Sequence, residues 1–148
     1  MGYFIVNIFS FQIRKCDAQG CGYYGAPRGS HKHKGVDLVC EAGTPIQSPI
    51  VGMITKIGWP YPDEERRHLR YVEITSEGWA YRVMYVEPLL ELWQNVTAGD
   101  IICRSLTLKD IFPGITDHIH FEVIDSKNNH IDPTPIYLAG RSQLWDID

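Results

Sequence analysis

The sequence predicts a single, mainly β domain, built as a compact antiparallel β-sheet or sandwich with few short helices. Three observations support this prediction. The chain has 148 residues, which is enough for one hydrophobic core. Its apolar segments are short and rich in β-branched and aromatic residues. Clusters of glycine and proline separate these segments, as is typical of strands joined by tight turns.

Five segments carry the strand pattern. The run 36–40 is short and β-branched, 50–57 contains an internal glycine, and 70–75 alternates clearly. The run 79–86 is aromatic and β-branched with partial alternation, and 118–124 alternates as well. Turn signals lie between the strands, at 41–45, 59–62, 76–78, 98–100 and 113–114.

Helical signals are weak in this chain. Only 64–69 and 89–93 resemble short helical turns. The amino-terminal residues 1–12 are expected to form an edge strand or an arm docked on the domain. We expect residues 1–148 to form one domain and the protein to be a monomer.

Composition and charge exclude several classes of protein. The chain is 44% hydrophobic and 22% charged, so neither a disordered nor a fibrous protein is indicated. The formal net charge is -4, which provides no basic field for nucleic acid. A basic cluster at 28–34 is best interpreted as a solvated loop.

The amino terminus and the cysteines bear on localisation. The apolar run GYFIVNIF is too short to span a membrane and lacks the basic leader of a signal peptide. Cys16 and Cys21 are predicted to form a small disulfide loop, with two free thiols or a metal pair as the alternatives. A disulfide favours an oxidising compartment, so we expect an extracellular or periplasmic protein.

Two short histidine motifs suggest a metal site. His33 and Asp37 form H-x-x-x-D, and His118 and His120 form H-x-H at the start of a strand. Residues i and i+2 of a strand face the same side, so His118 and His120 point together. Two imidazoles and a carboxylate are the ligand set of a catalytic zinc with one open position. The motifs therefore predict one Zn²⁺ if they meet in space.

Each motif also has an ordinary interpretation. H-x-x-x-D is common, and H-x-H alone is often two unremarkable strand histidines. His68 and His130 lie outside both motifs and are expected to be solvent-exposed. Co-occurrence of the two motifs, each beside a strand signal, favours the metal site.

The motifs and their context resemble the lysostaphin/LytM-type zinc endopeptidases, which cut peptidoglycan cross-bridges. The matching framework segments are GVDL (35–38), AGTPIQSP (42–49), GMI (52–54), AGDII (98–102), HFE (120–122) and DPTPIYL (132–138). The resemblance is strongest to the leukocyte cell-derived chemotaxin branch, through segments 13–22, 33–40, 84–88 and 112–115. It implies an antiparallel β fold with a zinc-binding groove.

The resemblance also assigns roles to the motif residues. It implies that His33, Asp37 and His120 are the zinc ligands and that His118 lies beside the metal-bound water. The active endopeptidases carry another histidine in a Tyr-x-His-Leu context, where this chain has Glu87. A carboxylate cannot donate to an oxyanion, but it can act as a base. Glu87 and His118 are therefore the predicted catalytic residues if the chain is an enzyme.

Two functions are consistent with these residues. The first is a metallopeptidase that hydrolyses short peptidoglycan peptides by zinc-activated water; Gly29, Ser30 and Gly35 near the groove would suit a substrate with little side chain. The second is a catalytically silent, chemotaxin-like secreted protein that binds a receptor or glycan, with a structural zinc.

The remaining cysteines depart from the chemotaxin pattern. The positions of one bridge of that branch are Ala80 and Ile124 here, and the expected partner of Cys40 is missing. Cys103 is an additional cysteine. Cys40 and Cys103 are predicted either to form a second disulfide or to remain as two buried free thiols.

Overall fold

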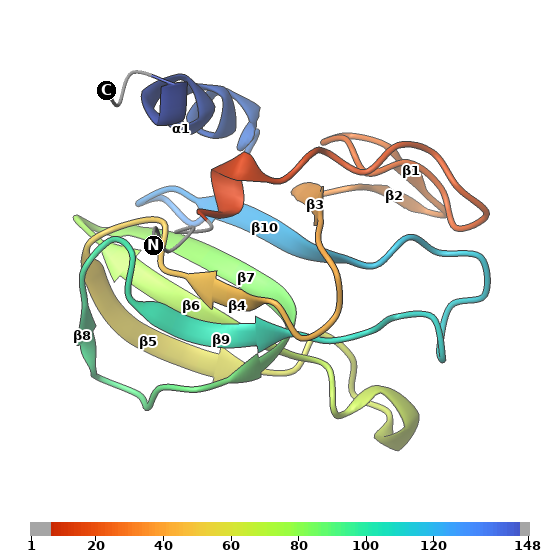
Figure 1. Ribbon diagram of the computed structural model, residues 1–148, viewed down its shortest axis with the longest axis horizontal. Helices are drawn as coiled ribbons and strands as arrows, with labels where there is room; N and C mark the ends of the chain where they lie inside the picture. The colour runs from red at the N-terminus through yellow and green to blue at the C-terminus, as the bar shows by residue number, and fades with distance from the viewer. Residues whose placement is uncertain (1–6, 146–148) are drawn as a thin grey trace, which may run out of the picture.

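The computed structural model describes residues 7–145 and confirms a mainly β domain (Figure 1). The strands of this part are β1 (Pro27–Arg28), β2 (His31–Lys32), β3 (Val36–Val39), β4 (Pro45–Gln47), β5 (Gly52–Gly58), β6 (Arg70–Ser76), β7 (Trp79–Pro88), β8 (Asn95–Val96), β9 (Ile101–Ser105), β10 (His118–Ile124) and β11 (His130–Ile131). The helical segments are the short 3-10 helices η1 (Ile8–Ser10) and η2 (Glu64–Arg66) and the α-helix α1 (Thr134–Trp145).

Within the described residues, nine strands form one antiparallel sheet, and β1 and β2 form a separate hairpin. The main path through the sheet is β11-β10-β7-β6-β5-β8. Strand β3 pairs with β10, while β9 pairs with both β4 and β7. Each of the five predicted strand segments is confirmed in position, as β3, β5, β6, β7 and β10.

Strand β10 links three other strands of the sheet and carries both histidines of the H-x-H motif. All of its residues are buried, and it pairs with β3, β7 and β11. Its alternating side chains point to two different environments. Phe121 is fully buried and packs edge-on against Phe9 in the hydrophobic core, with ring centroids 6.0 Å apart. The histidines of β10 point the other way, as the period of two requires.

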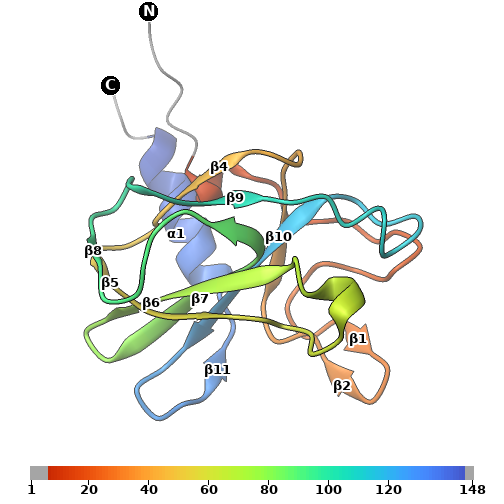
Figure 2. The ribbon, with the colours of Figure 1, turned by 90° about the horizontal axis from the view of Figure 1, so that it is seen from below.

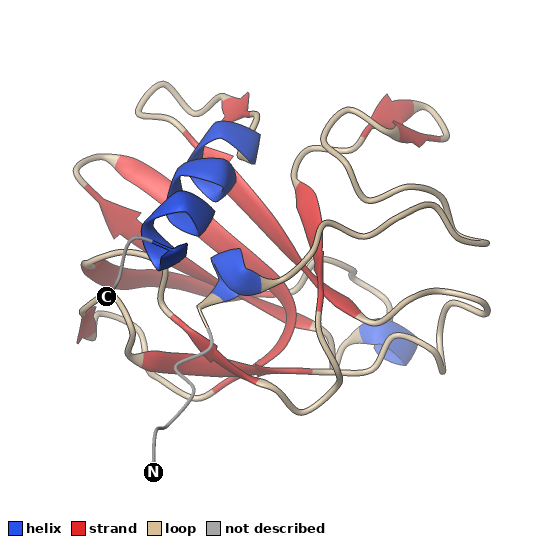
Figure 3. Cartoon of the chain, turned by 45° about the horizontal axis from the view of Figure 1, so that its top comes forward, coloured by secondary structure: helices blue, strands red, loops and turns tan. Residues whose placement is uncertain are grey.

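Residues 7–12, the described part of the amino-terminal segment, dock on the domain and form no edge strand. Residues 1–6 of the predicted strand or arm lie outside the described residues. In the remainder, η1 buries Ile8 and Phe9, and Phe9 also packs against Tyr137 of α1 at 6.5 Å. Figure 3 shows η1 beside α1 on the same side of the sheet. Burial of these side chains fixes the arm.

Helix α1 was not expected from the sequence. Asp132 marks its start, because its carboxylate accepts a hydrogen bond from the backbone N–H of Thr134 at 2.9 Å. Pro135 falls in the first turn, where a missing N–H is tolerated. The two expected helical turns differ from the prediction: 64–69 contains only the 3-10 helix η2, and 89–93 forms turns without a helix.

Three connections gather at one side of the sheet, next to the start of β10. They are the β1–β2 hairpin, the segment carrying η2, and the connection from β9 to β10 (Figures 1 and 2). These connections surround the functional site described below. No helix among the described residues is long and apolar enough to cross a membrane.

Candidate metal centre

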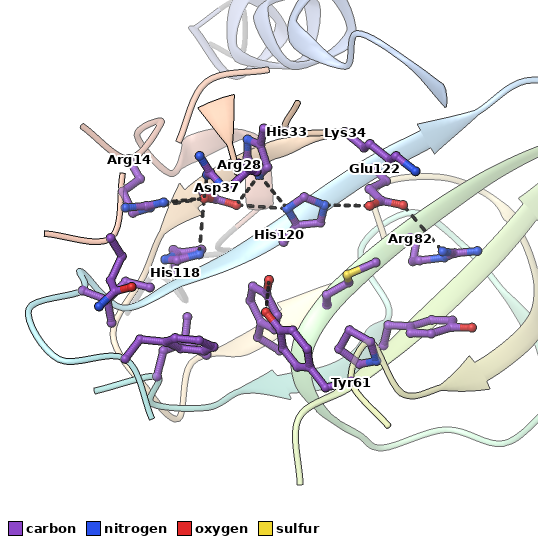
Figure 4. Close-up of a pocket in the computed structure, with 18 of the residues that line it drawn as sticks. Arg14, Arg28, His33, Lys34, Asp37, Tyr61, Arg82, His118, His120 and Glu122 are labelled. Atoms are coloured by element: carbon purple, nitrogen blue, oxygen red, sulfur yellow. Dashed lines mark hydrogen bonds and ion pairs between the residues drawn. The ribbon is translucent and has the colours of Figure 1, made fainter. Parts of the chain in front are cut away.

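Pairing of β3 with β10 brings the two histidine motifs together. In the antiparallel register, Asp37 of β3 lies directly opposite His120 of β10. His33 precedes β3 and reaches the same point from the loop after the β1–β2 hairpin. The three side chains are buried and converge on one another (Figure 4).

The potential ligand atoms lie at contact distance. His33 Nε2 is 3.1 Å and His120 Nδ1 is 3.0 Å from Oδ1 of Asp37, and the two imidazole nitrogens are 3.0 Å apart. The geometry therefore gathers His33, Asp37 and His120 into one group that could hold a metal ion.

The outer partners of the histidines set their tautomers. His33 Nδ1 lies 2.9 Å from the carbonyl oxygen of Tyr23, and His120 Nε2 lies 2.8 Å from Oε1 of Glu122. Both partners are acceptors, so the outer ring nitrogens carry protons. When the inner nitrogens are deprotonated, they and the Asp37 oxygen present lone pairs to one another. Either a proton on an inner nitrogen or a metal ion at the centre satisfies these lone pairs, and the donor set fits zinc.

Electrostatics favour positive charge at this point. Burial alone would lower the pKa of His120, but hydrogen bonds to Asp37 and Glu122 raise it to about 9. Burial would raise the pKa of Asp37, but hydrogen bonds from His120 and His33 hold it well below its usual range. The Arg14 guanidinium, which is also buried, donates to Oδ2 of Asp37 at 3.0 Å and 3.2 Å.

His118 stands next to this group, as predicted. Its Nε2 atom lies 3.4 Å from Oδ2 of Asp37, and its Nδ1 atom lies 2.6 Å from the carbonyl oxygen of Thr116. The carbonyl fixes the proton on Nδ1 and leaves a lone pair on Nε2. Burial lowers the pKa of His118 below its ordinary value, so the ring is neutral at pH 7. A neutral imidazole with a free Nε2 can accept a proton.

Glu87 does not join the site. Its side chain is exposed, and it does not line the pocket that contains the other candidate residues. Strand β7 pairs with β10 from Ala80 to Met84, but from Val86 onward it pairs with β9. Glu87 therefore lies opposite Arg104 of β9 instead of beside β10. In this geometry Glu87 lies outside the site, and its participation in catalysis stays a prediction.

Sequence reasoning missed two charged partners of the site. Glu122 orients His120 and also contacts His130, whose Nε2 atom lies 3.0 Å from Oε2 of Glu122. His130 is consequently half-buried, not simply solvated as expected. The signal for Glu122 was present, since it follows His120 by two residues on the same strand. Arg14 carried no such signal, because it reaches Asp37 only through the fold.

The disulfide between Cys16 and Cys21 is confirmed. The loop that it closes holds Arg14 in place: Asp17 lies 2.8 Å from the guanidinium, and the Gly20 carbonyl accepts a hydrogen bond from it at 2.9 Å. Cys40 and Cys103 are free, buried thiols, so the second of the two alternatives holds for them. Burial raises the pKa of the Cys40 thiol to about 11.

A pocket of about 550 Å³ opens in front of the metal group. One wall carries the polar residues of β3 and β10. Tyr61 lies across the pocket from His120 in Figure 4. The aromatic residues that line the pocket are Trp59, Tyr61, Tyr71, Tyr85 and Phe112.

The small residues that were expected to admit a small substrate have structural roles instead. Gly29 has a φ of 58° and forms the turn of the β1–β2 hairpin. A Cβ atom on Gly35 would overlap the carbonyl oxygen of Phe121. These glycines permit the backbone geometry, and neither is among the residues that line the pocket.

Comparison with known proteins agrees with this fold and site. The model of peptidase family M23 matches residues 31–133. The chain belongs to this family. Among M23-related proteins, it is 33% identical over 129 residues to leukocyte cell-derived chemotaxin-2 from Bos taurus, covering 87% of this chain and 81% of that protein. Myeloid protein 1 from Gallus gallus is 31% identical over 137 residues, covering 89% of this chain and 40% of that protein.

Solved structures share the M23 fold. The catalytic domain of lysostaphin from Staphylococcus simulans matches with a TM-score of 0.64 and 21% identity, covering 88% of this chain and 95% of that domain. LytU matches with a TM-score of 0.62 and 23% identity, covering 80% and 83%. At these low identities, the structural likeness establishes the fold alone. Both resemblances predicted from the sequence, to the LytM-type superfamily and to its chemotaxin branch, are confirmed.

Proposed function

We propose that this M23 family member is a zinc-binding recognition domain, which binds a peptide ligand in its pocket without hydrolysing it. The observation that carries the distinction is the position of Glu87. This residue stands where the active endopeptidases have a further histidine, and it is exposed on the β9 side of β7. The pocket therefore keeps a metal group but lacks the donor that the resemblance requires.

His33, Asp37 and His120 are the residues that would hold zinc. A bound zinc supplies Lewis acidity and a water whose pKa falls to about 7. The protein supplies the orientation of the ligands. The Tyr23 carbonyl and the Glu122 carboxylate fix the two imidazoles, since hydrogen bonds from outer ring nitrogens set the direction of the inner ones. Arg14 balances the charge of Asp37 from the far side.

A second candidate function is peptide-bond hydrolysis, as in the peptidoglycan-cleaving relatives. It is favoured by His118, whose free Nε2 atom lies at the edge of the metal group in the state required of a general base. The chemotaxin relatives favour the first candidate. Hydrolysis in this chain would have to proceed with His118 and without Glu87.

We further propose that the protein acts outside the cytoplasm. A structural disulfide persists in oxidising compartments such as the extracellular space or the periplasm. The name chemotaxin in its relatives agrees with a secreted role. A receptor segment is then the expected ligand, with glycan or peptidoglycan peptides as the alternatives.

Two measurements on one preparation test the proposal. Zinc is titrated calorimetrically into chelator-treated protein, and the loaded protein is incubated with purified peptidoglycan and pentaglycine, with lysostaphin as the positive control. We expect one zinc per chain and no cleavage. Zinc-dependent cleavage that disappears in His118→Ala would overturn silent binding in favour of hydrolysis. Failure to bind zinc would contradict both candidates.

A further inference from the structure

Tyr85 has an unusual backbone conformation that turns it toward the pocket. Its φ is 72°, a region that L residues other than glycine rarely adopt. The other non-glycine residues with positive φ among the described residues lie in turns, whereas Tyr85 lies within strand β7. It forms a bulge, since Arg70 pairs with Val86 and Tyr71 pairs with Met84. Such strain is concentrated at functional sites.

The Tyr85 ring forms part of a rigid aromatic wall. It lies edge-on to His118, with ring centroids 5.6 Å apart, and 6.1 Å from His120. Tyr61 stacks on Tyr85 with an angle of 5° between the rings and also lies 6.1 Å from Phe112.

Other residues of the loop that carries Tyr61 hold its ring in place. The Arg66 guanidinium lies 4.0 Å from the centroid of the Tyr61 ring, and Asp63 accepts hydrogen bonds from Arg66. This cation–π contact fixes the Tyr61 ring without using its hydroxyl. The aromatic wall is therefore positioned before any ligand arrives.

The two tyrosine hydroxyls leave one donor unused. Their oxygens lie 3.3 Å apart, and either hydroxyl can donate to the other. Each hydroxyl carries one proton, so this bond uses one of two O–H donors. Neither hydroxyl makes another hydrogen bond within residues 7–145. The remaining O–H can donate to an oxygen of a ligand.

Apolar side chains also line this pocket. Phe112 and Ile115, from the connection between β9 and β10, are partly exposed and lie among its lining residues. Asp117 fixes that connection, because it accepts a hydrogen bond from the backbone N–H of Leu108 at 2.8 Å. Burial of a large apolar side chain against such a surface is favourable.

We propose that Tyr61 and Tyr85 determine the specificity of the pocket, and that its ligand is a peptide with a bulky apolar side chain such as leucine. The side chain packs against Phe112 and its neighbours, and a backbone carbonyl of the peptide accepts a hydrogen bond from the tyrosine pair. This inference rests on the proposed function for the placement of the ligand in this pocket. It excludes the glycine-rich substrate that Gly29 and Gly35 suggested.

The test uses two peptides that differ in one side chain, acetyl-Gly-Leu-Gly-amide and acetyl-Gly-Gly-Gly-amide. Each is titrated into metal-free and zinc-loaded protein, and binding is followed through the ring resonances of Tyr61 and Phe112 by NMR. We expect the leucine peptide to bind about tenfold more tightly in both forms, because apolar burial does not need the metal. Equal affinities, or no shift of these resonances, would overturn the inference.

Conservative variants test the hydroxyl pair. The double variant Tyr61→Phe/Tyr85→Phe keeps both rings and removes both O–H donors, so it should weaken binding of the leucine peptide about fivefold, through loss of a hydrogen bond. Either single variant leaves one hydroxyl free to donate and should change the affinity less. Tyr81→Phe, on the same strand as Tyr85 but outside the pocket, should leave the affinity unchanged. Wild-type affinity in the double variant would contradict the role of the pair.

Zinc titration of the same samples separates the two proposals. Zinc binding without a preference for leucine would contradict only the specificity inference. A preference for leucine without zinc binding would contradict only the proposed zinc site.

Discussion

The two walls of the pocket owe their positions to different physical causes. One wall, called the polar wall below, is formed by β3 and β10. Its residues His33, Asp37 and His120 are held by direct polar contacts with one another and with Arg14 and Glu122. On the facing wall, the side chains are aromatic, and the backbone decides their direction. There β7 exchanges β10 for β9 as its neighbour, and the strained residue Tyr85 lies at the exchange.

This difference predicts which substitutions the protein tolerates. Removing any one member of a buried cluster of charged side chains destabilises the protein, because the remaining members stay unpaired in the interior. An aromatic wall retains most of its packing when only a hydroxyl is removed. Substitutions on the two walls should therefore affect stability and metal binding very differently.

The largest effect is expected from Asp37→Ala. The change would leave Arg14, which is only 3% exposed, without its buried carboxylate. We expect a loss of about 3–5 kcal/mol in the free energy of unfolding, measured by urea denaturation. Asp63→Ala removes the exposed ion pair with Arg66 and should cost much less than Asp37→Ala, because solvent screens the pair. Similar losses of unfolding free energy in the two variants would contradict the greater sensitivity of the buried charged cluster.

Zinc itself should stabilise the polar wall. At a free zinc concentration of about 100 Kd, binding to the folded state alone adds about 2.7 kcal/mol. A chelator should therefore lower the melting temperature of the wild-type protein, as followed by circular dichroism. The shift should vanish in His33→Ala and persist in Tyr85→Phe. A full shift in His33→Ala would show that zinc binds elsewhere.

The two glutamates provide a sharper comparison within the site. Glu122→Gln weakens the acceptor that orients His120 and should lower zinc affinity about 10- to 100-fold. Glu87→Gln changes an exposed residue outside the pocket and should leave zinc affinity unchanged. Calorimetry measures the zinc affinity of both variants, and a large loss of affinity in Glu87→Gln would show that Glu87 contributes to the metal site.

The disulfide should make a smaller contribution, at the flank of the polar wall. Replacement of Cys16 and Cys21 by serine should lower the free energy of unfolding by about 2 kcal/mol in the chain-entropy model. Alkylation of unfolded wild-type protein without reductant should label two thiols, Cys40 and Cys103. Mass spectrometry would contradict this assignment if four thiols, or none, were labelled.

Much of the polar wall could be predicted from the sequence because its signals are local. Alternation identified β10, and the same period of two placed His118 and His120 on one face. The family resemblance supplied the partnership with His33 and Asp37. Their convergence within contact distance follows from the register of β3 against β10.

The parts that sequence reasoning missed depend on non-local pairing. Arg14 meets Asp37 across the fold, and no spacing in the sequence encodes that contact. The position of Glu87 outside the pocket could not be predicted, because the exchange of β10 for β9 along β7 is a property of the sheet. Helix α1 escaped detection because prolines crowd its start and its apolar residues show little amphipathic periodicity.

The proposed zinc centre consists of His33, Asp37 and His120. It can be tested by calorimetric titration of zinc into metal-free wild-type protein and into His120→Ala, with folding of both checked by circular dichroism. We expect one zinc per chain in the wild type and none in the folded variant. Binding of equal stoichiometry and affinity in His120→Ala would show that these three residues do not form the site.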